Sequence, residues 1–252
     1  MSDINILNEY GKSIGLHFDD SQLSQFQRYY ELLIEWNDKI NLTTITEYND
    51  VMLKHFIDSV SITFGKDTNL ISRLVNGESL SVIDVGCGAG FPSLPLKIAF
   101  PNLKVTMLDS LNKRINFLNV VIDELGLKDI SAVHGRAEDF AKPDKLRESF
   151  DICVSRAVAN LSTLSEYCLP YVKVGGALVA YKAELSPDEL DPGKKAIYIL
   201  GGDIEKIYQF VLPDSDYHRS LCVVSKKKVT PKKFPRKAGL PSKEPIGKEM
   251  NC

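Results

Sequence analysis

Apolar side chains near the start of the chain recur with the spacing of α-helices. After Asp19, Asp20 and Ser21, whose side chains suit a helix N-cap, apolar residues follow at the helical period of about 3.6, namely Leu23, Phe26, Tyr30, Leu33 and Ile34. A second helical stretch runs from about 50 to 64, with an apolar side made of Met52, Phe56, Ile57 and Val60. The amino-terminal part is therefore predicted to be a small helical cap.

From residue 81 onward the pattern changes to short apolar or β-branched runs, which are typical of buried strands. These runs are Ser81–Val85, Lys104–Asp109, Ile130–His134, Phe150–Ser155 and Gly176–Tyr181. Helical patterns lie between them, one closed by Gly126 and another by Gly175 and Gly176. Strands that alternate with helices predict right-handed crossovers and a parallel sheet with helices on both faces.

Two further apolar runs, at about Ile204–Phe210 and Ser220–Ser225, have no convincing helical pattern between them. They are predicted to close the sheet as an antiparallel pair. The fold class is therefore α/β, with a mostly parallel sheet, an antiparallel carboxyl-terminal strand and a helical cap in front. We place the cap at 1–65, the core at 66–225 and a tail at 226–252.

The composition is that of a globular protein, because 44% of the 252 residues are hydrophobic and 25% are charged. No apolar run is long enough to cross a bilayer. Asp3, Asn5, Asn8 and Glu9 interrupt the first ten residues, where a secretory signal would be basic and then apolar. We therefore expect a cytoplasmic protein without a membrane partner.

Cysteines and histidines are spaced in a way that argues against disulfides and metal sites. The five cysteines are an odd number without any C-x-x-C pair; they are Cys87, Cys153, Cys168, Cys222 and Cys252. None of the four histidines lies four residues from another, as two metal ligands on one helix would. We expect no structural or catalytic metal.

The charge of the chain is strongly uneven. The whole chain carries −2, but nine basic and two acidic residues lie between Lys226 and Glu249, which makes that segment +7 and the remainder −9. The segment also holds four prolines and few apolar residues, so it is predicted to be an extended, flexible tail. A basic arm suits a polyanionic partner, and a purely solubilising tail is the alternative.

A glycine-rich turn follows the first predicted strand, which ends with Asp84 and Val85. Glycines at 86, 88 and 90 allow close approach of backbone to a ligand, and the helix start at Pro92 offers free N–H groups. A dinucleotide fingerprint would need a third glycine at 91, where Phe91 stands. An acidic residue followed by G-x-G-x-G is similar to the turn of Rossmann-like S-adenosylmethionine methyltransferases. Gly86 and Gly88 are thus candidate cofactor contacts, with a tight strand-to-helix turn as the alternative.

Acidic residues follow the next two strands. Asp109 ends the second strand, 23 residues after Gly86, where a carboxylate can accept both ribose hydroxyls of an adenosine. Ala137 and Glu138 come after the third strand, where this fold places the edge of the adenine ring. A solvated strand end for Asp109 and an acidic helix start for Glu138 are the alternatives.

The fourth strand ends at Ser155-Arg156-Ala157, where such enzymes face the methyl acceptor. The chain lacks the Asn or Asp with Pro-Pro-aromatic of amine methylation and the Pro-Cys nucleophile of pyrimidine C5 methylation, and Cys153 lies in an apolar strand. Guanine N7 fits, because its lone pair carries no proton and needs no general base. Arg156 suits the O6 and N7 edge of guanine and is the candidate catalytic residue, with a strand-end salt bridge as the alternative.

Several motifs together resemble the glucose-inhibited division protein B family, which is the small-subunit ribosomal RNA methyltransferase G group. The matching segments are Trp36–Thr43, His55–Ser59, Asp84–Leu96, Leu108–Arg114, Ser155–Val158 and Phe234–Lys243. The resemblance implies S-adenosylmethionine as cofactor and N7 of one guanine in 16S rRNA as the methylated atom. It also implies that the family's cofactor-binding positions are Gly86, Phe91, Ala137, Glu138 and Arg156.

Five further residues are candidates for RNA contact: His55, Lys182, Arg219, Arg236 and Lys237. Packing of His55 and plain surface charge for the others are the alternatives. Two other functions also stay open, a non-catalytic ribosome-binding or assembly factor on the same fold and a small-molecule methyltransferase. The expected partner is 16S rRNA or the 30S subunit, and we expect a monomer.

Overall fold

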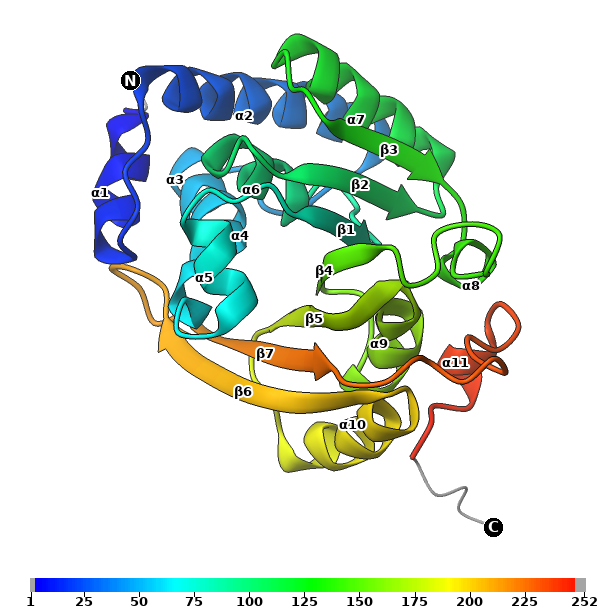
Figure 1. Ribbon diagram of the computed structural model, residues 1–252. Coiled ribbons are helices and arrows are strands. Elements are labelled where there is room, and N and C mark those ends of the chain that lie inside the picture. Colours follow the sequence, from blue (N-terminus) through cyan, green and yellow to red (C-terminus); the bar gives the residue numbers. More distant parts are fainter. Residues whose placement is uncertain (1–2, 248–252) are drawn as a thin grey trace.

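A seven-stranded sheet forms the centre of the protein, whose computed structural model describes residues 3–247 (Figure 1). The strands lie in the order β3-β2-β1-β4-β5-β7-β6. Their bounds are Ser81–Val85 (β1), Lys104–Asp109 (β2), Ile130–His134 (β3), Phe150–Arg156 (β4), Val172–Lys182 (β5), Gly202–Val211 (β6) and His218–Lys226 (β7). The first five strands are parallel, and β7 is antiparallel to both β5 and β6. The predicted fold class is confirmed.

The carboxyl ends of the parallel strands meet at one edge of the sheet. Val85 at the end of β1 pairs with Leu108, which in turn pairs with Val133 in β3. Strand β7 begins at the same edge, because Ser220 pairs with Lys182 at the end of β5. Loops that are far apart in sequence therefore share the edge at which ligands bind in open α/β sheets.

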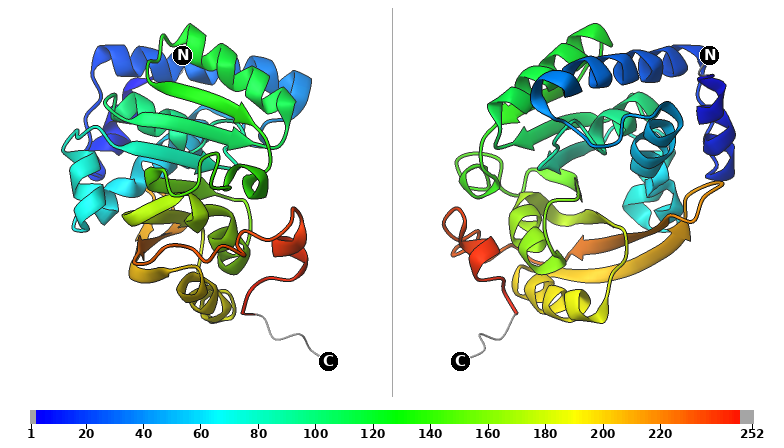
Figure 2. Two further views of the ribbon diagram at one scale, coloured as in Figure 1. Left: turned by 45° about the vertical axis from the view of Figure 1, so that its right-hand side comes forward. Right: turned by 180° about the vertical axis from the view of Figure 1, so that it is seen from behind.

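Helices that connect the strands cover both faces of the sheet (Figure 2). They are α6 (Ser93–Ala99), α7 (Asn112–Glu124), α8 (Ala137–Phe140), α9 (Leu161–Cys168), the 3-10 helix η3 (Leu169–Tyr171) and α10 (Pro187–Ile199). Neighbouring residues of β1 serve opposite faces, since Val82 packs with α6 and α7 whereas Ile83 packs with α9 and α10. Helix α7 buries Ile115, Leu118 and Ile122, as its spacing predicts.

The amino-terminal helices pack on the α6–α7 face of the sheet. They are α1 (Asn5–Ser13), α2 (Asp20–Ile40), α3 (Tyr48–Val51), the π-helix η1 (Met52–Ile57), α4 (Asp58–Val60), the 3-10 helix η2 (Ser61–Gly65) and α5 (Asn69–Val75). Asp19 caps α2 by accepting from the backbone N–H of Gln22, whose side chain accepts from Asp19 in return. Helix α2 lies along α7, with the ring centroids of Trp36 and Phe117 5.8 Å apart. The boundary of this cap at residue 65 stays a prediction.

Helix α10 has no counterpart in the sequence analysis. Pro187 starts it and Pro192 lies inside it, so the apolar period that marks other helices is broken. Its packing on α9 depends on Gly193, where an added Cβ would lie 2.7 Å from Leu161 Cδ2. Ser186 caps the start of this helix by accepting from the N–H of Glu189, and contact with α9 accounts for its buried side.

The segment after β7 differs from the flexible tail that the sequence predicts. Residues 227–247 lie against the body, include α11 (Leu240–Lys243) and bury Phe234 and Pro241. Polar contacts hold the segment; for example, Arg147 donates to the carbonyl oxygen of Phe234 at 2.7 Å. The segment is held by contacts with the body, so it does not need a hydrophobic core of its own. Composition alone cannot reveal such contacts. The remaining tail positions, 248–252, lie outside the described residues.

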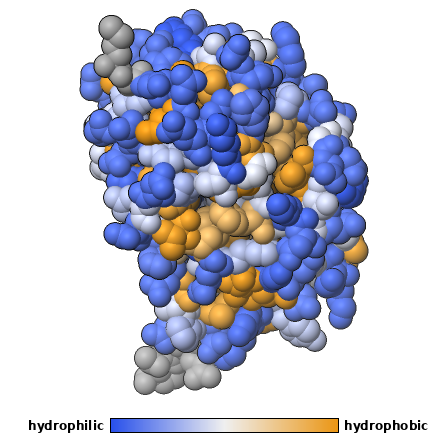
Figure 3. Space-filling model, turned by 90° about the vertical axis from the view of Figure 1, so that its left-hand side faces the viewer, coloured by the Kyte–Doolittle hydropathy of each residue, from blue (hydrophilic) through white to orange (hydrophobic). Residues whose placement is uncertain are grey.

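Apolar side chains on the surface gather in patches bordered by hydrophilic residues on the face shown in Figure 3. Large side chains with apolar surface are also exposed at the turn between β6 and β7, where Val211 and Tyr217 are each 41% exposed. The exposure of single side chains such as these two is ordinary for a folded chain. Within residues 3–247, no helix combines the length and apolar character that a membrane span requires.

Candidate active site

A cavity of about 380 Å³ opens at the carboxyl edge of the sheet, between the ends of β1 to β4. The loops after these strands and the carboxyl-terminal segment wall it. Its lining residues are Val85, Gly86, Leu108, Asp109, Ser110, Arg114, Gly135, Arg136, Ala137, Glu138, Ala157, Val158, Tyr167, Gly239 and Ser242. The sequence-predicted residues that meet here are thus Gly86, Asp109, Ala137 and Glu138.

The turn after β1 brings backbone to the wall of this cavity. Gly86 has φ of 76°, and its N–H donates to the carbonyl oxygen of Leu108 at 2.8 Å. A Cβ added there would lie 2.6 Å from Cγ2 of Val158, which also lines the cavity. Only glycine combines this left-handed backbone with so close a neighbour.

Asp109 presents a carboxylate that nearby groups hold in place. The side chain is 3% exposed and accepts from the N–H groups of Gly88 and Leu111, each at 2.9 Å. Nη1 of Arg114 donates to the same carboxylate at 3.3 Å. Gly88 therefore acts by orienting Asp109 and is not part of the lining. An oriented carboxylate of this kind can accept hydroxyl protons of a ligand.

Glu138 lies across the cavity at the start of α8. It is 8% exposed, and its Oε1 accepts from the backbone N–H of Gly239 at 2.8 Å. The preceding Ala137 is held by Tyr171, whose hydroxyl donates to the carbonyl oxygen of Ala137 at 2.6 Å. Burial raises the pKa of Tyr171, so the phenol stays protonated as this donor.

The residues of the cavity fit a nucleoside that carries a sulfonium group. Two carboxylates, those of Asp109 and Glu138, line it together with the apolar surfaces of Leu108, Ala137 and Val158. The volume lies in the usual range for small-molecule sites, about 300–1,000 Å³. Because Gly86 has no side chain, a ligand can approach the backbone of the wall there. A Cβ at this position would instead collide with Val158. The residues that line the cavity therefore fit S-adenosylmethionine, the cofactor implied by the resemblance.

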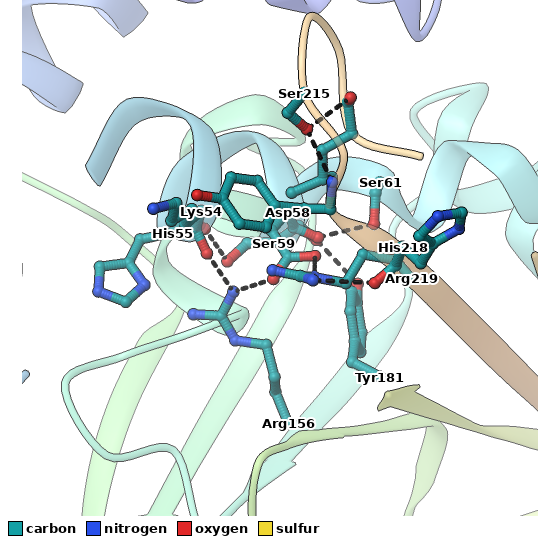
Figure 4. Close-up of polar contacts among 12 residues, drawn as sticks. Lys54, His55, Asp58, Ser59, Ser61, Arg156, Tyr181, Ser215, His218 and Arg219 are labelled. Carbon is teal, nitrogen blue, oxygen red and sulfur yellow. Dashed lines mark hydrogen bonds and ion pairs between the residues drawn. The ribbon is translucent and has the colours of Figure 1, made fainter. Parts of the chain in front are cut away.

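Arg156 takes part in a second constellation beside the cavity (Figure 4). Its Nη1 donates to Asp58 Oδ2 at 2.9 Å and to the carbonyl oxygen of Lys54 at 3.2 Å. Nε of Arg219, from β7, donates to Oδ1 of the same Asp58 at 3.0 Å. Because the Asp58 side chain is only 7% exposed, the two arginines share a buried carboxylate. We call these three residues the Asp58 cluster.

Phe91 and His55 extend the Asp58 cluster. The guanidinium carbon of Arg156 lies 5.1 Å from the centroid of the Phe91 ring, and the His55 ring stacks on Phe91 at 4.4 Å. Nε2 of His55 lies 2.8 Å from Oγ1 of Thr43. Burial and then the charge of Arg156 lower the pKa of His55 to about 3, which keeps the imidazole neutral. The predicted alternative of a packed, hydrogen-bonded histidine describes this geometry.

The other predicted RNA contacts do not come together. Lys182 forms an ion pair with Glu189 at 2.6 Å, and Arg236 forms one with Glu166 at 2.6 Å. Lys237 is exposed. Neither Phe91 nor Arg156 lines the cavity. Their roles, like those of all the predicted site residues, stay predictions.

Three groups of this site carry no signal in the sequence that assigns them their roles. Gly239 and Ser242 line the cavity, although they lie about 100 residues after Glu138, and no local pattern links them. Asp58 belongs to the family motif His55–Ser59, but its pairing with Arg156 and Arg219 depends on how the fold brings distant segments together. Arg114 also stood in a quoted motif, and its distance of five residues from Asp109 gave no signal.

Asp84 lies under the glycine-rich turn without reaching the cavity. Its side chain is fully buried, and Oδ2 accepts from the N–H of Ser93 at 3.2 Å at the start of α6. Burial raises the pKa of Asp84 to about 7, opposed by the Ser93 hydrogen bonds. The residue therefore joins the turn to α6 and is not a ligand contact.

The cysteines of the described residues lie in the interior of the protein. The four cysteines within residues 3–247 are free and buried, and Cys252 lies outside the described residues. Burial raises the pKa of the Cys87 and Cys153 thiols well above the ordinary value. In the same part of the chain no group of three or more His, Cys, Asp or Glu residues could hold a metal ion.

Comparison with known proteins finds close relatives over nearly the whole chain. A family described as rRNA small subunit methyltransferase G matches residues 22–218. The ribosomal RNA small subunit methyltransferase G of Exiguobacterium sibiricum is 52% identical over 233 residues, which is 92% of this chain and 94% of that protein. The protein of the same name from Bacillus cytotoxicus is 50% identical over 234 residues, 93% of this chain and 95% of that protein.

Solved structures share the fold at low sequence identity. A mutant 16S rRNA (adenine(1408)-N(1))-methyltransferase from Catenulisporales acidiphilia, crystallised with its cosubstrate SAM, matches with a TM-score of 0.51 and 14% identity. The match covers 64% of this chain and 91% of that chain. This likeness supports the Rossmann-like architecture and nothing finer.

Proposed function

The chain belongs to the rRNA small subunit methyltransferase G family, and from this membership we propose that it methylates N7 of a guanine in 16S rRNA with S-adenosylmethionine as donor. The observation that carries the proposal is the family match over residues 22–218. That match contains β1 to β5 and the Asp58 cluster apart from Arg219, which follows it by one residue. The cavity at the sheet edge supplies an independent reason, because its lining suits the same donor.

Within this proposal, the cavity residues hold the donor. Asp109 accepts the ribose hydroxyls, and Ala137 and Glu138 border the adenine ring. Gly86 provides a wall of bare backbone, and Gly88 keeps the Asp109 carboxylate in position. These roles rest on the position of each residue in the fold and on its place in the family's motifs.

The chemistry asks the protein for alignment more than for proton transfer. When bound, S-adenosylmethionine supplies an electrophilic methyl group. Guanine N7 bears a lone pair and no proton, so no side chain has to act as a general base. Orientation of two reactants can supply about 7–11 kcal/mol of the barrier. The two cysteines near the site, Cys87 and Cys153, are buried thiols and offer no nucleophile for a covalent route.

We assign Arg156 to contact with the guanine or the donor. Among the described residues, its side-chain hydrogen bonds all use Nη1, which leaves the donors on Nε and Nη2 for a ligand. Asp58 and Phe91 hold the guanidinium at the tip of β4, beside Ala157 and Val158 of the cavity wall. The neutral imidazole of His55 stacks on the ring of Phe91 and acts as a packing residue.

The RNA surface includes the basic residues of the same edge. Arg219 lies in the Asp58 cluster, and the exposed Lys237 is free to meet a phosphate. Lys182 and Arg236 share their charges with Glu189 and Glu166, so any RNA contact by them adds to these ion pairs. We propose that the substrate is 16S rRNA, either free or within the 30S subunit, and that one chain acts alone.

The test is methyl transfer with labelled S-adenosylmethionine to 30S subunits from cells that lack this protein. We expect one methyl group per 16S rRNA and a single reverse-transcription stop after borohydride and aniline treatment, which marks N7-methylguanine. Gly86→Arg serves as the inactive control. Binding of both donor and 30S subunits without any transferred methyl would contradict the proposal, and a methyl group on another atom would contradict the N7 assignment.

A further inference from the structure

The carboxyl-terminal segment, residues 227–247, returns to the cofactor cavity from the opposite edge of the sheet; we call it the strap. It leaves β7 at Lys226, next to the middle of β5, where Ser225 pairs with Ala177. It then passes η3 and α9 and reaches Glu138. Figure 2 shows the segment lying against the same side of the body as α9. Residues that follow the last strand of the sheet thus reach its ligand edge.

A buried ion pair anchors the strap to α9. Nη2 of Arg236 donates to Oε2 of Glu166 at 2.6 Å, and the backbone N–H of Arg236 donates to Oε1 at 2.8 Å. Glu166 is 1% exposed, so Arg236 is its counter-charge. Two hydroxyls of α9 add contacts, since Thr163 donates to the carbonyl oxygen of Pro241 at 3.1 Å and Ser162 donates to that of Ile246.

The inner side of the strap forms part of the cavity wall. Gly239 and Ser242 line the cavity beside Tyr167 and Glu138. The N–H of Gly239 donates to Oε1 of Glu138 at 2.8 Å, so the strap also orients a carboxylate of the body. A ligand that fills this end of the cavity contacts the body and the strap at once.

We propose that the strap is a working part of the cofactor site, which closes its Glu138 end, and that cofactor binding and strap docking stabilise each other. The proposal rests on the function assigned above. Arg236 is then a positioning residue that acts through Gly239 and Ser242. Part of the strap's basic charge is thus paired with Glu166 of the body. Because the two events share one closed state, each must favour the other by the same factor.

Limited trypsin digestion of the full chain tests this coupling without any mutation. The probe is S-adenosylhomocysteine, the methyl-free product, whose binding to the chain is first measured by calorimetry. At 100 times its dissociation constant it should slow cleavage after Arg236 and Lys237 by up to about 100-fold. Cleavage after Lys12, at the end of α1, should not change. Equal rates in the strap with and without the bound probe would overturn the proposal.

Substitutions then test the anchor. Arg236→Met should weaken S-adenosylhomocysteine binding by on the order of tenfold. Arg236→Lys keeps the charge but loses the paired N–H donors of the guanidinium, so its affinity should lie between those of Arg236→Met and the unaltered chain. Lys232→Met is the matched control, because Lys232 is exposed in the same segment and the change removes the same charge. Circular dichroism checks that each variant is folded.

The outcomes separate this inference from the assigned function. If the unaltered chain does not bind S-adenosylhomocysteine, the cofactor assignment itself fails. If it binds, but Arg236→Met binds as tightly as Lys232→Met, the strap proposal alone fails. If Arg236→Met does not fold, digestion of the unaltered chain decides the question.

Discussion

The cofactor cavity and the Asp58 cluster lie side by side at one edge of the sheet, yet they are built in opposite ways. In the cavity, Asp109 is held by Gly88, Leu111 and Arg114, which lie at most 21 residues away along the chain. In the cluster, Asp58 is held by Arg156 and Arg219, which lie 98 and 161 residues away. One carboxylate is positioned by its own loops, and the other joins the cap to the sheet.

The difference shows in what each carboxylate can do. Asp109 is oriented by two backbone N–H groups that local turns provide, and it still faces an open cavity. Asp58 neutralises two partly buried guanidiniums and is not among the residues that line the cavity. We therefore expect changes in the cavity to affect ligand binding, and the loss of the Asp58 carboxylate to affect above all the stability of the fold.

The largest effect should follow Gly86→Arg in the cavity. The new side chain would need a left-handed backbone and would meet Val158 at its first carbon. We expect no detectable binding of S-adenosylmethionine by calorimetry, with a circular dichroism spectrum close to that of the unaltered chain.

Gly175→Arg is the matched control for this change. Gly175 also has a positive φ, of 87°, but an added Cβ there meets nothing within 4 Å. It should share the backbone strain, about 1–2 kcal/mol, and keep its cofactor affinity. If both variants lost binding equally, strain rather than blockage of the cavity would be the cause.

The next effect concerns Asp58→Asn in the cluster. The change leaves Arg156 and Arg219 without their counter-charge in a largely buried place, so we expect a loss of about 3 kcal/mol in the free energy of unfolding. Urea denaturation at neutral pH measures it. Glu35→Gln, which breaks the exposed ion pair with Lys39, is the control and should leave stability unchanged. A loss no greater than that of the control would show that the cluster does not hold the cap.

Lowering the pH should change the stability of the fold in opposite directions through His55, beside the Asp58 cluster, and Asp84, below the cavity turn. The pKa of His55 falls from 6.5 to about 3 on folding, so the unfolded chain binds the proton first and His55 costs stability as the pH drops below 6.5. The pKa of Asp84, below the cavity turn, rises from 3.8 to about 7, so the folded chain binds that proton first and gains stability over the same range. In the unaltered chain the two contributions offset each other.

Single variants should reveal each contribution. Between pH 6.5 and pH 5, Asp84→Asn should lose about 1.5 kcal/mol more stability than the unaltered chain, and His55→Gln should lose about 1.5 kcal/mol less. Urea denaturation at a series of pH values measures both. Parallel curves for all three proteins would mean that neither group titrates as its burial requires.

The smallest effect should come from Arg114→Met in the cavity. Arg114 is 32% exposed on its side chain, and Asp109 keeps its two backbone donors without it, so we expect a stability loss below about 1 kcal/mol. The same substitution in the cluster, Arg219→Met, should cost more, because the buried Asp58 would keep only one partner. Equal losses would remove the contrast between the two carboxylates.

The sequence alone determined the alternation of strands and helices, the cap on α2, the glycine turn after β1 and the acids at the ends of β2 and β3. Each depends on spacing or backbone conformation within a few residues, and that information is local. The family motifs carried the prediction further, to the cofactor and the methylated atom.

Only the tertiary structure decided which distant charges pair and what the carboxyl-terminal segment does. Composition favoured a flexible basic tail, but Arg236 finds a buried counter-charge in Glu166, 70 residues earlier. For Arg156 the sequence left a ligand contact and a strand-end salt bridge open, and the structure shows the salt bridge, with Asp58, which Arg219 shares. The reason is physical: the energy of a buried charge depends on what surrounds it, and its surroundings are set by how the whole sheet and its helices pack.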